Sequence, residues 1–254
     1  MPIASGIHYT IFEGREAGPP VVVLLHGAGS SRLVWPRELR RLRGYRVLTL
    51  DLPGHGKSRN QFAGQSLQTY ARQMIDFLLS LEITRVYLVG HSMGGAIALS
   101  MADRYPQMMA GLVLISSGAS LSVSQEWLSS MADPDTIGIA AEQFRRSAFS
   151  AKTDPAIVEM VMEKMEAARS SVIYADWLAC SAFDMREQID QINIRTKLIW
   201  GADDQITPLS NAHYLINQLP DADLEIIPDA GHLVVLEQPQ AVAESVLRFI
   251  THLK

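Results

Sequence analysis

The sequence has few of the features that mark a secreted, membrane-spanning or nucleic-acid-binding protein. It contains one cysteine, Cys180, so no disulfide can form within the chain. No apolar run approaches the ~18 residues of a membrane-spanning helix, and the first residues lack the charged start and apolar core of a signal peptide. The net charge of -5 supplies no basic surface for nucleic acid or anionic lipid. We therefore expect a cytoplasmic protein that binds neither nucleic acid nor membrane.

Sites for metals and nucleotides are also missing. No spacing of histidines and carboxylates is typical of a metal site. Gly27-Ala28-Gly29 starts like a dinucleotide-binding loop, but Arg32 stands where the third glycine is needed. Gly56-Lys57-Ser58 ends like a phosphate-binding loop, yet its first glycine is replaced by Asp51. We expect neither a cofactor nor a metal, and a small molecule as the ligand.

One stretch of the sequence combines a strand, a sharp turn and a helix around a serine. Val86–Val89 is a short buried-strand pattern, and Met93–Ala102 is a helical pattern that Pro106 stops. Between them lies Gly90-His91-Ser92-Met93-Gly94. A serine with its hydroxyl exposed on a strained turn needs neighbours without bulky side chains, and the helix start suits a developing negative charge. This arrangement predicts a nucleophilic Ser92.

Several motifs, including the one around Ser92, resemble those of α/β-hydrolase-fold proteins over nearly the whole chain apart from one insert. They are Gly90–Gly94, His26–Gly29, Asp51–Ser58, Gly201–Asp204 with Pro208, and Gly231–His232. The resemblance implies a mostly parallel central sheet flanked by helices, with a serine, an acid and a histidine in that chain order.

The pattern of strands and helices agrees with such a fold. Strand-like runs alternate with helical stripes: Val21–Leu25, Tyr45–Leu50, Leu67–Leu81, Leu112–Ile115, Thr196–Trp200, Leu224–Ile227 and Ala241–Leu253. From about Ala119 to Ile192 the strands stop, and Pro134 and Pro155, each after an aspartate, mark helix starts. This segment resembles the helical lid of many family members. We predict an α/β core of residues 1–118 and 193–254 with a lid of residues 119–192 inserted after the strand at 112–115.

His232 is the predicted general base. It is the one histidine that both follows Ser92 and lies directly after a core strand. His91 adjoins the nucleophile and should project away from it, whereas His26 and His55 belong to glycine loops and should orient backbone. Cys180 is expected to be a small buried hydrophobic residue rather than a second nucleophile.

The acid of the site is one of two neighbouring aspartates. In similar proteins the acid stands three residues after a glycine and four before a proline, which Gly201, Asp204 and Pro208 match. Asp203 is then expected to bond loop amides. The resemblance also implies that the backbone amides of Ala28 and Met93 form an oxyanion hole.

These residues predict a serine hydrolase that cleaves an ester or related acyl bond through an acyl-enzyme. C–C bond hydrolases, thioesterases and haloperoxidase-like enzymes share the same set of residues, and a small-molecule receptor with low turnover is an alternative from another class.

The insert is rich in methionine and aromatic residues, most of which should pack the lid onto the core. Its paired cations, Arg145 and Arg146, are expected on a solvated helix face, so the substrate should be largely apolar. The sequence predicts no oligomeric state.

Overall fold

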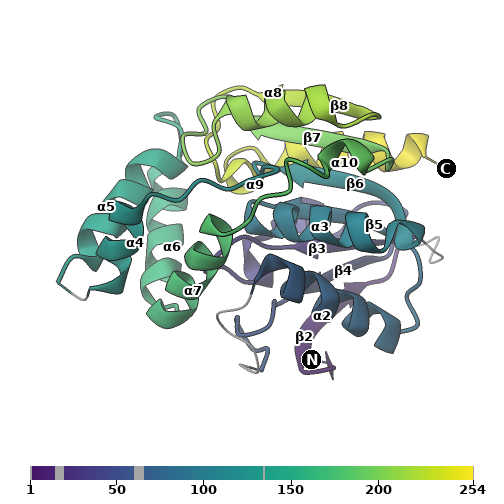
Figure 1. Ribbon diagram of the computed structural model, residues 1–254, viewed down its shortest axis with the longest axis horizontal. Helices are drawn as coiled ribbons and strands as arrows, with labels where there is room; N and C mark the ends of the chain where they lie inside the picture. Colours follow the sequence, from purple (N-terminus) through teal and green to yellow (C-terminus); the bar gives the residue numbers. More distant parts are fainter. Residues whose placement is uncertain (1, 15–19, 60–65, 134, 254) are drawn as a thin grey trace.

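An eight-stranded sheet forms the centre of the molecule (Figure 1). The computed structural model describes residues 2–14, 20–59, 66–133 and 135–253. The strand order in this part of the chain is β1-β2-β4-β3-β5-β6-β7-β8. Only the β1–β2 and β2–β4 pairings are antiparallel among those described. The predicted mostly parallel α/β sheet is therefore confirmed. The strands are β1 (Ile3–Ala4), β2 (Ile7–Phe12), β3 (Val21–Leu25), β4 (Val47–Leu50), β5 (Val86–His91), β6 (Met109–Ile115), β7 (Thr196–Gly201) and β8 (Ala222–Ile227).

Helices cover both faces of the sheet. The core helices are α1 (Arg37–Arg40), α2 (Leu67–Ser80), α3 (Met93–Arg104), α8 (Leu209–Gln218), α9 (Val234–Glu237) and α10 (Pro239–His252), and short 3₁₀ helices lie at Arg32–Val34, Pro106–Met108 and Ile189–Gln191. Alternate residues of β3 enter two separate apolar clusters: Val23 packs with α2 and α3, and Val22 packs with α1 and α10. This is why β3 is a continuous apolar run, since a central parallel strand is buried on both faces.

In the described residues between β6 and β7 there are four α-helices, and Figure 1 shows them beside one end of the sheet. They are α4 (Gln125–Ala132), α5 (Ile137–Ala148), α6 (Pro155–Glu166) and α7 (Ser170–Ser181); we call residues 119–192 the helical insert. Helix α6 begins at Pro155 as predicted, with the Asp154 side chain accepting a hydrogen bond from the Ala156 amide. Pro134, the other predicted helix start, lies outside the described residues. The action of the insert as a lid stays a prediction.

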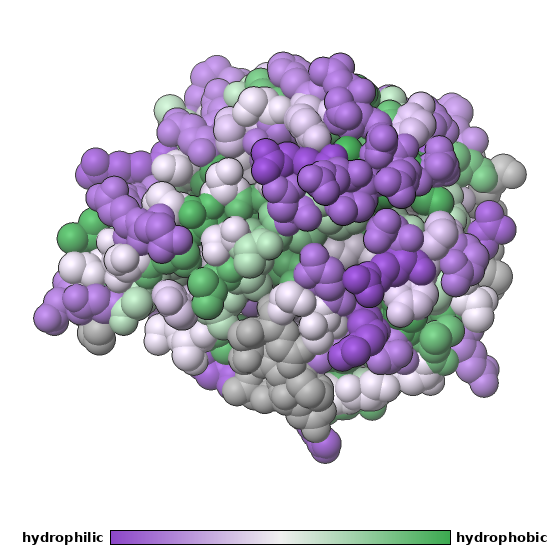
Figure 2. All heavy atoms as spheres, in the orientation of Figure 1, coloured by the Kyte–Doolittle hydropathy of each residue, from purple (hydrophilic) through white to green (hydrophobic). Residues whose placement is uncertain are grey.

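The last helix of the insert packs onto the core. The end of α7 and the residues after it, including Cys180 and Phe183, join the cluster formed by α2 and α3. Cys180 is buried, as predicted, and burial raises the pKa of its thiol well above the ordinary value. Other apolar side chains of the insert are in contact with solvent, among them Ile139 of α5 and Leu178 of α7. Figure 2 shows apolar surface on the side of the molecule where the insert lies.

The start of α3 lies directly against the ends of β3 and β5. A Cβ on Gly94 would lie 2.2 Å from the carbonyl oxygen of Leu25, and one on Gly90 would lie 2.3 Å from that of Gly94. Both neighbours are backbone atoms and cannot rotate away as a flexible side chain would. The glycines on either side of Ser92 therefore permit a backbone packing that no other residue allows.

This packing makes Gly94→Ala strongly destabilising. We expect a loss of at least about 2 kcal/mol in the free energy of unfolding, because the added methyl group has to displace the β3 backbone. Gly138→Ala in α5 is the matched control, since nothing lies within 4 Å of its Cβ position; it should be neutral or gain up to ~1 kcal/mol. Urea unfolding of both variants measures the difference. Equal midpoints would contradict the close packing.

Candidate active site

Ser92 lies at the turn between β5 and α3 with a strained backbone. Its φ of 54° and ψ of -122° belong to a region that non-glycine residues rarely adopt, at a cost of about 1–3 kcal/mol. Hydrogen bonds hold this turn on both sides: the Ser92 amide donates to the carbonyl of Ile115 (2.9 Å), and the Ser92 carbonyl accepts from the Ser117 hydroxyl (2.8 Å). The backbone of the turn is thereby held in this conformation.

His232 lies on the loop after β8 and reaches Ser92. Its Nε2 is 2.9 Å from Ser92 Oγ, and its Nδ1 is 3.0 Å from Asp204 Oδ2. With the ring proton on Nδ1, the imidazole donates to the carboxylate and accepts from the serine hydroxyl. The backbone carbonyl of His232 accepts a hydrogen bond from His91 Nε2 (2.8 Å). The structure thus brings together the three side chains that the sequence singled out.

Asp204 is buried after the end of β7 and has a full set of donors. Its Oδ1 accepts from the amides of Ile206 and Thr207 at 3.0 and 2.9 Å, and its Oδ2 accepts from the Thr207 hydroxyl at 2.8 Å. Burial acts to raise the pKa of Asp204, but the charge and hydrogen bond of His232 and the bonds from Thr207 outweigh it, so its pKa lies below the ordinary value. The carboxylate is therefore ionised beside His232.

Asp203 does not have the role that the sequence predicted. Its Oδ2 accepts a hydrogen bond from the hydroxyl of Ser150 in the insert (2.5 Å), whereas the nearby loop amides bond to Asp204 instead. The reason is orientation: Asp204 is buried within its own loop, and Asp203 is exposed on the side next to the insert. The expected bonding of loop amides by Asp203 was wrong.

The carboxylate of Glu237 joins the insert to the loop that carries His232. Glu237 Oε2 accepts from the Ser150 amide (2.9 Å), from the Thr153 hydroxyl (2.5 Å) and from the Gly231 amide (3.0 Å). Gly231 directly precedes His232, so the segment between α5 and α6 takes part in holding that loop.

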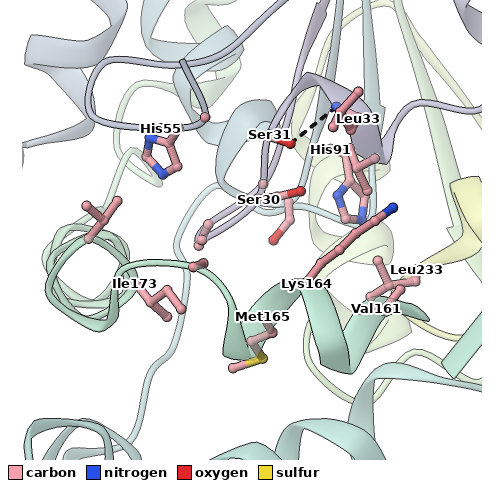
Figure 3. Close-up of a pocket in the computed structure, with 18 of the residues that line it drawn as sticks. Ser30, Ser31, Leu33, His55, His91, Val161, Lys164, Met165, Ile173 and Leu233 are labelled. Carbon is pink, nitrogen blue, oxygen red and sulfur yellow. Dashed lines mark hydrogen bonds between the residues drawn. The ribbon is translucent and has the colours of Figure 1, made fainter. Parts of the chain in front are cut away.

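The pocket above Ser92 encloses about 380 Å³, within the range of small-molecule sites. Most of the side chains that line it are apolar and come from both the insert and the core: Phe144, Val161, Met165, Val172, Ile173 and Trp177 from the insert, with Val34, Leu233 and Leu236 from the core. Figure 3 shows Ile173 and Met165 on one side of the pocket and Ser30 and Ser31 on the other. Ser92 and His232 line it as well.

Among the described residues, two exposed cations line the pocket, and the sequence patterns singled out neither of them. They are Lys164 of α6 and Arg169, which donates to the Gly54 carbonyl (Figure 3 shows Lys164). Arg145 instead pairs with Glu159 and Glu142 on the outside of α5 and α6. Arg145 and its neighbour Arg146 lie on a solvated helix face, as expected.

Ala28 and Met93 are the two residues whose backbone amides are predicted to form the oxyanion hole. Ala28 follows β3 and lines the pocket, and Met93 begins α3. The amide of a first helical residue has no acceptor within its own helix, so it can donate to a ligand. Their role in stabilising an oxyanion stays a prediction.

The model of the alpha/beta hydrolase family matches residues 22–245, which is most of the chain. The chain belongs to the alpha/beta hydrolase family.

Relatives in this family differ in the bonds they cleave. The chain is 28% identical to a 2-hydroxy-6-oxo-6-phenylhexa-2,4-dienoate hydrolase from Burkholderia cepacia, over 91% of this chain and 87% of the relative. It is 24% identical to a monoacylglycerol lipase from Rattus norvegicus, over 94% and 77%. An enol-lactonase from Burkholderia xenovorans LB400 shares the fold with a TM-score of 0.88 at 21% identity, over 96% of each chain.

No helix in the described residues of this alpha/beta hydrolase is long and apolar enough to span a membrane. In the same residues, no group of three or more histidine, cysteine or acidic side chains could hold a metal ion. A cytoplasmic setting stays a prediction.

Two buried histidines near the site, His91 and His26, are neutral. Burial is the main cause that lowers the pKa of His91 to about 3 and that of His26 to about 4, so both are neutral. His26 accepts from the Leu52 amide (3.0 Å) and orients backbone, as predicted. His91 does so too through the carbonyl of His232, although its ring lies beside His232 at 5.1 Å rather than away from the site.

His55 has a partner that sequence reasoning missed. Its Nε2 lies 2.6 Å from Oδ2 of Asp176, a fully buried carboxylate of α7. The available signal was a single acid within the otherwise apolar run Ile173–Cys180. A buried charge in such a run requires a partner, but the sequence does not show which one.

Proposed function

We propose that this protein is a serine hydrolase that cleaves a carboxylic ester, or a related acyl bond, of a small and largely apolar substrate. The observation that carries the proposal is the continuous hydrogen-bonded series from Asp204 through His232 to Ser92, beneath a pocket of small-molecule size. A serine hydroxyl is a weak nucleophile at neutral pH, and a histidine that accepts its proton supplies the activation required.

In this mechanism His232 moves one proton in each half-reaction. Ser92 Oγ attacks the acyl carbon as its proton passes to His232 Nε2, and Asp204 stabilises the resulting imidazolium. The amides of Ala28 and Met93 stabilise the oxyanion. His232 then protonates the leaving alcohol, and an acyl-enzyme remains on Ser92. Water then attacks the acyl carbon as His232 takes its proton, and His232 returns that proton to Ser92 Oγ as the acid leaves.

The helical insert acts in this proposal as a lid. Supporting it, insert residues such as Phe144, Met165 and Trp177 share one pocket with Ser92 and His232. An apolar cover excludes water from the developing charges and selects acyl groups by burial of their methylenes.

C–C bond hydrolysis on the same residues is the second candidate. The observations that favour it are the similarity to the Burkholderia cepacia hydrolase and the two cations, Lys164 and Arg169, that line the pocket. A screen of ester, thioester, lactone and carboxylate-bearing vinylogous diketone substrates at equal enzyme concentration separates the two. Fastest turnover of the diketone would replace the esterase assignment.

Ser92 should be the sole covalent nucleophile. A fluorophosphonate probe is expected to label the protein once, and peptide mass spectrometry should locate the label on Ser92. Ser92→Ala should abolish labelling, whereas Ser80→Ala, at an exposed serine at the end of α2, should retain it. Undiminished labelling of Ser92→Ala would contradict the assignment. A receptor with low turnover would show labelling without sustained release of product from simple esters.

Asp204→Asn should lower kcat on the order of 10⁴-fold, because the amide no longer holds His232 in the required tautomer. Asp203→Asn is the matched control: it changes a bond to Ser150 and should lower kcat less than about tenfold. Steady-state kinetics with p-nitrophenyl butyrate measure both. The reverse order of effects would move the acid to Asp203.

The apolar pocket predicts a preference for medium acyl chains. Each buried methylene should contribute about 0.8 kcal/mol, or about fourfold in kcat/KM, until the pocket is full. We expect p-nitrophenyl esters to improve from acetate to butyrate or hexanoate and then decline. Replacing Arg145 and Arg146 with alanine should leave the series unchanged, since both lie outside the pocket. A steady preference for acetate would argue against an apolar acyl site.

A further inference from the structure

Asp176 is a fully buried carboxylate that the proposed chemistry does not use. It lies on α7 of the insert and accepts three hydrogen bonds: from the Gly29 amide (2.8 Å) and His55 Nε2 (2.6 Å) at Oδ2, and from the Tyr70 hydroxyl (3.1 Å) at Oδ1. An isolated carboxylate in this position would be costly, so these donors account for its presence. What distinguishes the cluster is where the donors come from.

Each donor belongs to a different part of the core. Gly29 follows Ala28 in the loop after β3, His55 lies in the glycine loop after β4, and Tyr70 is on α2. The insert is therefore joined at one side chain to three segments that are far apart in the sequence. One of them is the loop that carries a proposed oxyanion amide.

The His55–Asp176 contact is an ion pair. His55 Nδ1 faces the carbonyl of Pro53 (3.0 Å) while Nε2 faces the carboxylate, so both ring nitrogens have to donate and the imidazole is positively charged. Burial acts to lower the pKa of His55, but the hydrogen bond and charge of Asp176 outweigh it, and Asp51 adds to them, so the pKa is raised. The neutral ring of His26 lies at 4.9 Å.

Gly29 is held from two directions by the same helix. Its amide is bonded to Asp176, and a Cβ on it would lie 3.0 Å from Cγ1 of Ile173, one turn earlier in α7. Its φ of 62° is one that glycine adopts without strain. The peptide unit that directly follows Ala28 is thus fixed in position and orientation by α7.

We propose that Asp176 is a positioning residue: through the Gly29 amide, the insert holds the Ala28 amide where it can stabilise an oxyanion. The inference rests on the proposed serine hydrolase. It makes the insert part of the apparatus that stabilises the transition state, in addition to a cover for the pocket. Because an oxyanion exists only in the transition state and tetrahedral intermediates, loss of Asp176 should lower kcat and leave KM nearly unchanged.

The test compares Asp176→Ala with two matched variants in p-nitrophenyl butyrate hydrolysis. Asp176→Ala should lower kcat at least tenfold, toward the ~10²–10³-fold that follows loss of a whole oxyanion donor. Asp176→Asn retains an oxygen that can accept from the Gly29 amide and should recover most of kcat. Tyr70→Phe removes a hydrogen bond of the same carboxylate without touching the loop, and should change kcat less than about threefold.

The inhibition constant of a transition-state analogue distinguishes positioning of the oxyanion hole from a purely structural role of Asp176, which would leave that constant unchanged. Butyl trifluoromethyl ketone adds to the serine and places an oxyanion in the hole, so its inhibition constant should rise in parallel with the loss of kcat in Asp176→Ala. An unchanged inhibition constant, or a kcat within threefold of the original, would overturn the proposal.

Asp176→Ala leaves the charge of His55 buried without its partner and can fail to fold. The double variant Asp176→Leu with His55→Leu removes both charges, and such apolar replacements of buried ion pairs are often tolerated. It also lacks an acceptor for Gly29, so it should show the same loss of kcat and of inhibitor affinity once a thermal unfolding transition establishes that it is folded. Retained kcat in this variant would count against the proposal. Failure of the proposed function itself is distinguishable, because the unaltered protein would then show neither ester turnover nor labelling of Ser92.

Discussion

The close contact between the first turn of α3 and the ends of β3 and β5 is the constraint on which the site depends. Gly90 and Gly94 leave no side chain between these backbones, and Ser92 between them is forced to a positive φ. A larger residue at either glycine would move α3 away from the sheet. The turn would then relax, and the hydroxyl would no longer point at His232. The geometry of the reacting atoms is therefore set by backbone packing two residues to either side of Ser92.

The same kind of contact places the other two side chains. A Cβ on Gly201 would lie 2.2 Å from the carbonyl oxygen of Gly231, so the loops that carry Asp204 and His232 are pressed together backbone to backbone. The sequence could predict this part because glycine and proline spacings report local backbone geometry directly. The predicted strand before Ser92 and the position of His232 after a strand follow from such local signals, whereas the choice of Asp204 came from the resemblance to the family. The predicted element ends were less exact, since β6, for example, begins at Met109 rather than Leu112. The expected role of Asp203 was wrong as well.

Contacts between the insert and the core could not be predicted in this way. Helical periodicity shows which face of α7 is apolar, but it contains no information about which loop that face will meet. The bonds of Asp176 to Gly29 and His55 span more than a hundred residues of sequence, and so do not appear in any local pattern. The same limit explains why the sequence analysis discussed Arg145 as a cation of the insert and did not mention Lys164. Both residues are cations on insert helices, and only the packing of the helices decides which one lines the pocket.

The bonds of Glu237 have a consequence for attempts to exchange inserts between related enzymes in order to change substrate preference. One carboxylate binds Ser150 and Thr153 of the insert and also the amide next to His232. A transplanted insert without matching donors at those two positions would leave Glu237 bonded to the Gly231 amide alone. Glu237 could then move, and the loop that carries His232 would move with it. The segment is therefore not an independent module: a working chimera has to carry the α5–α6 junction and its acceptor on α9 together.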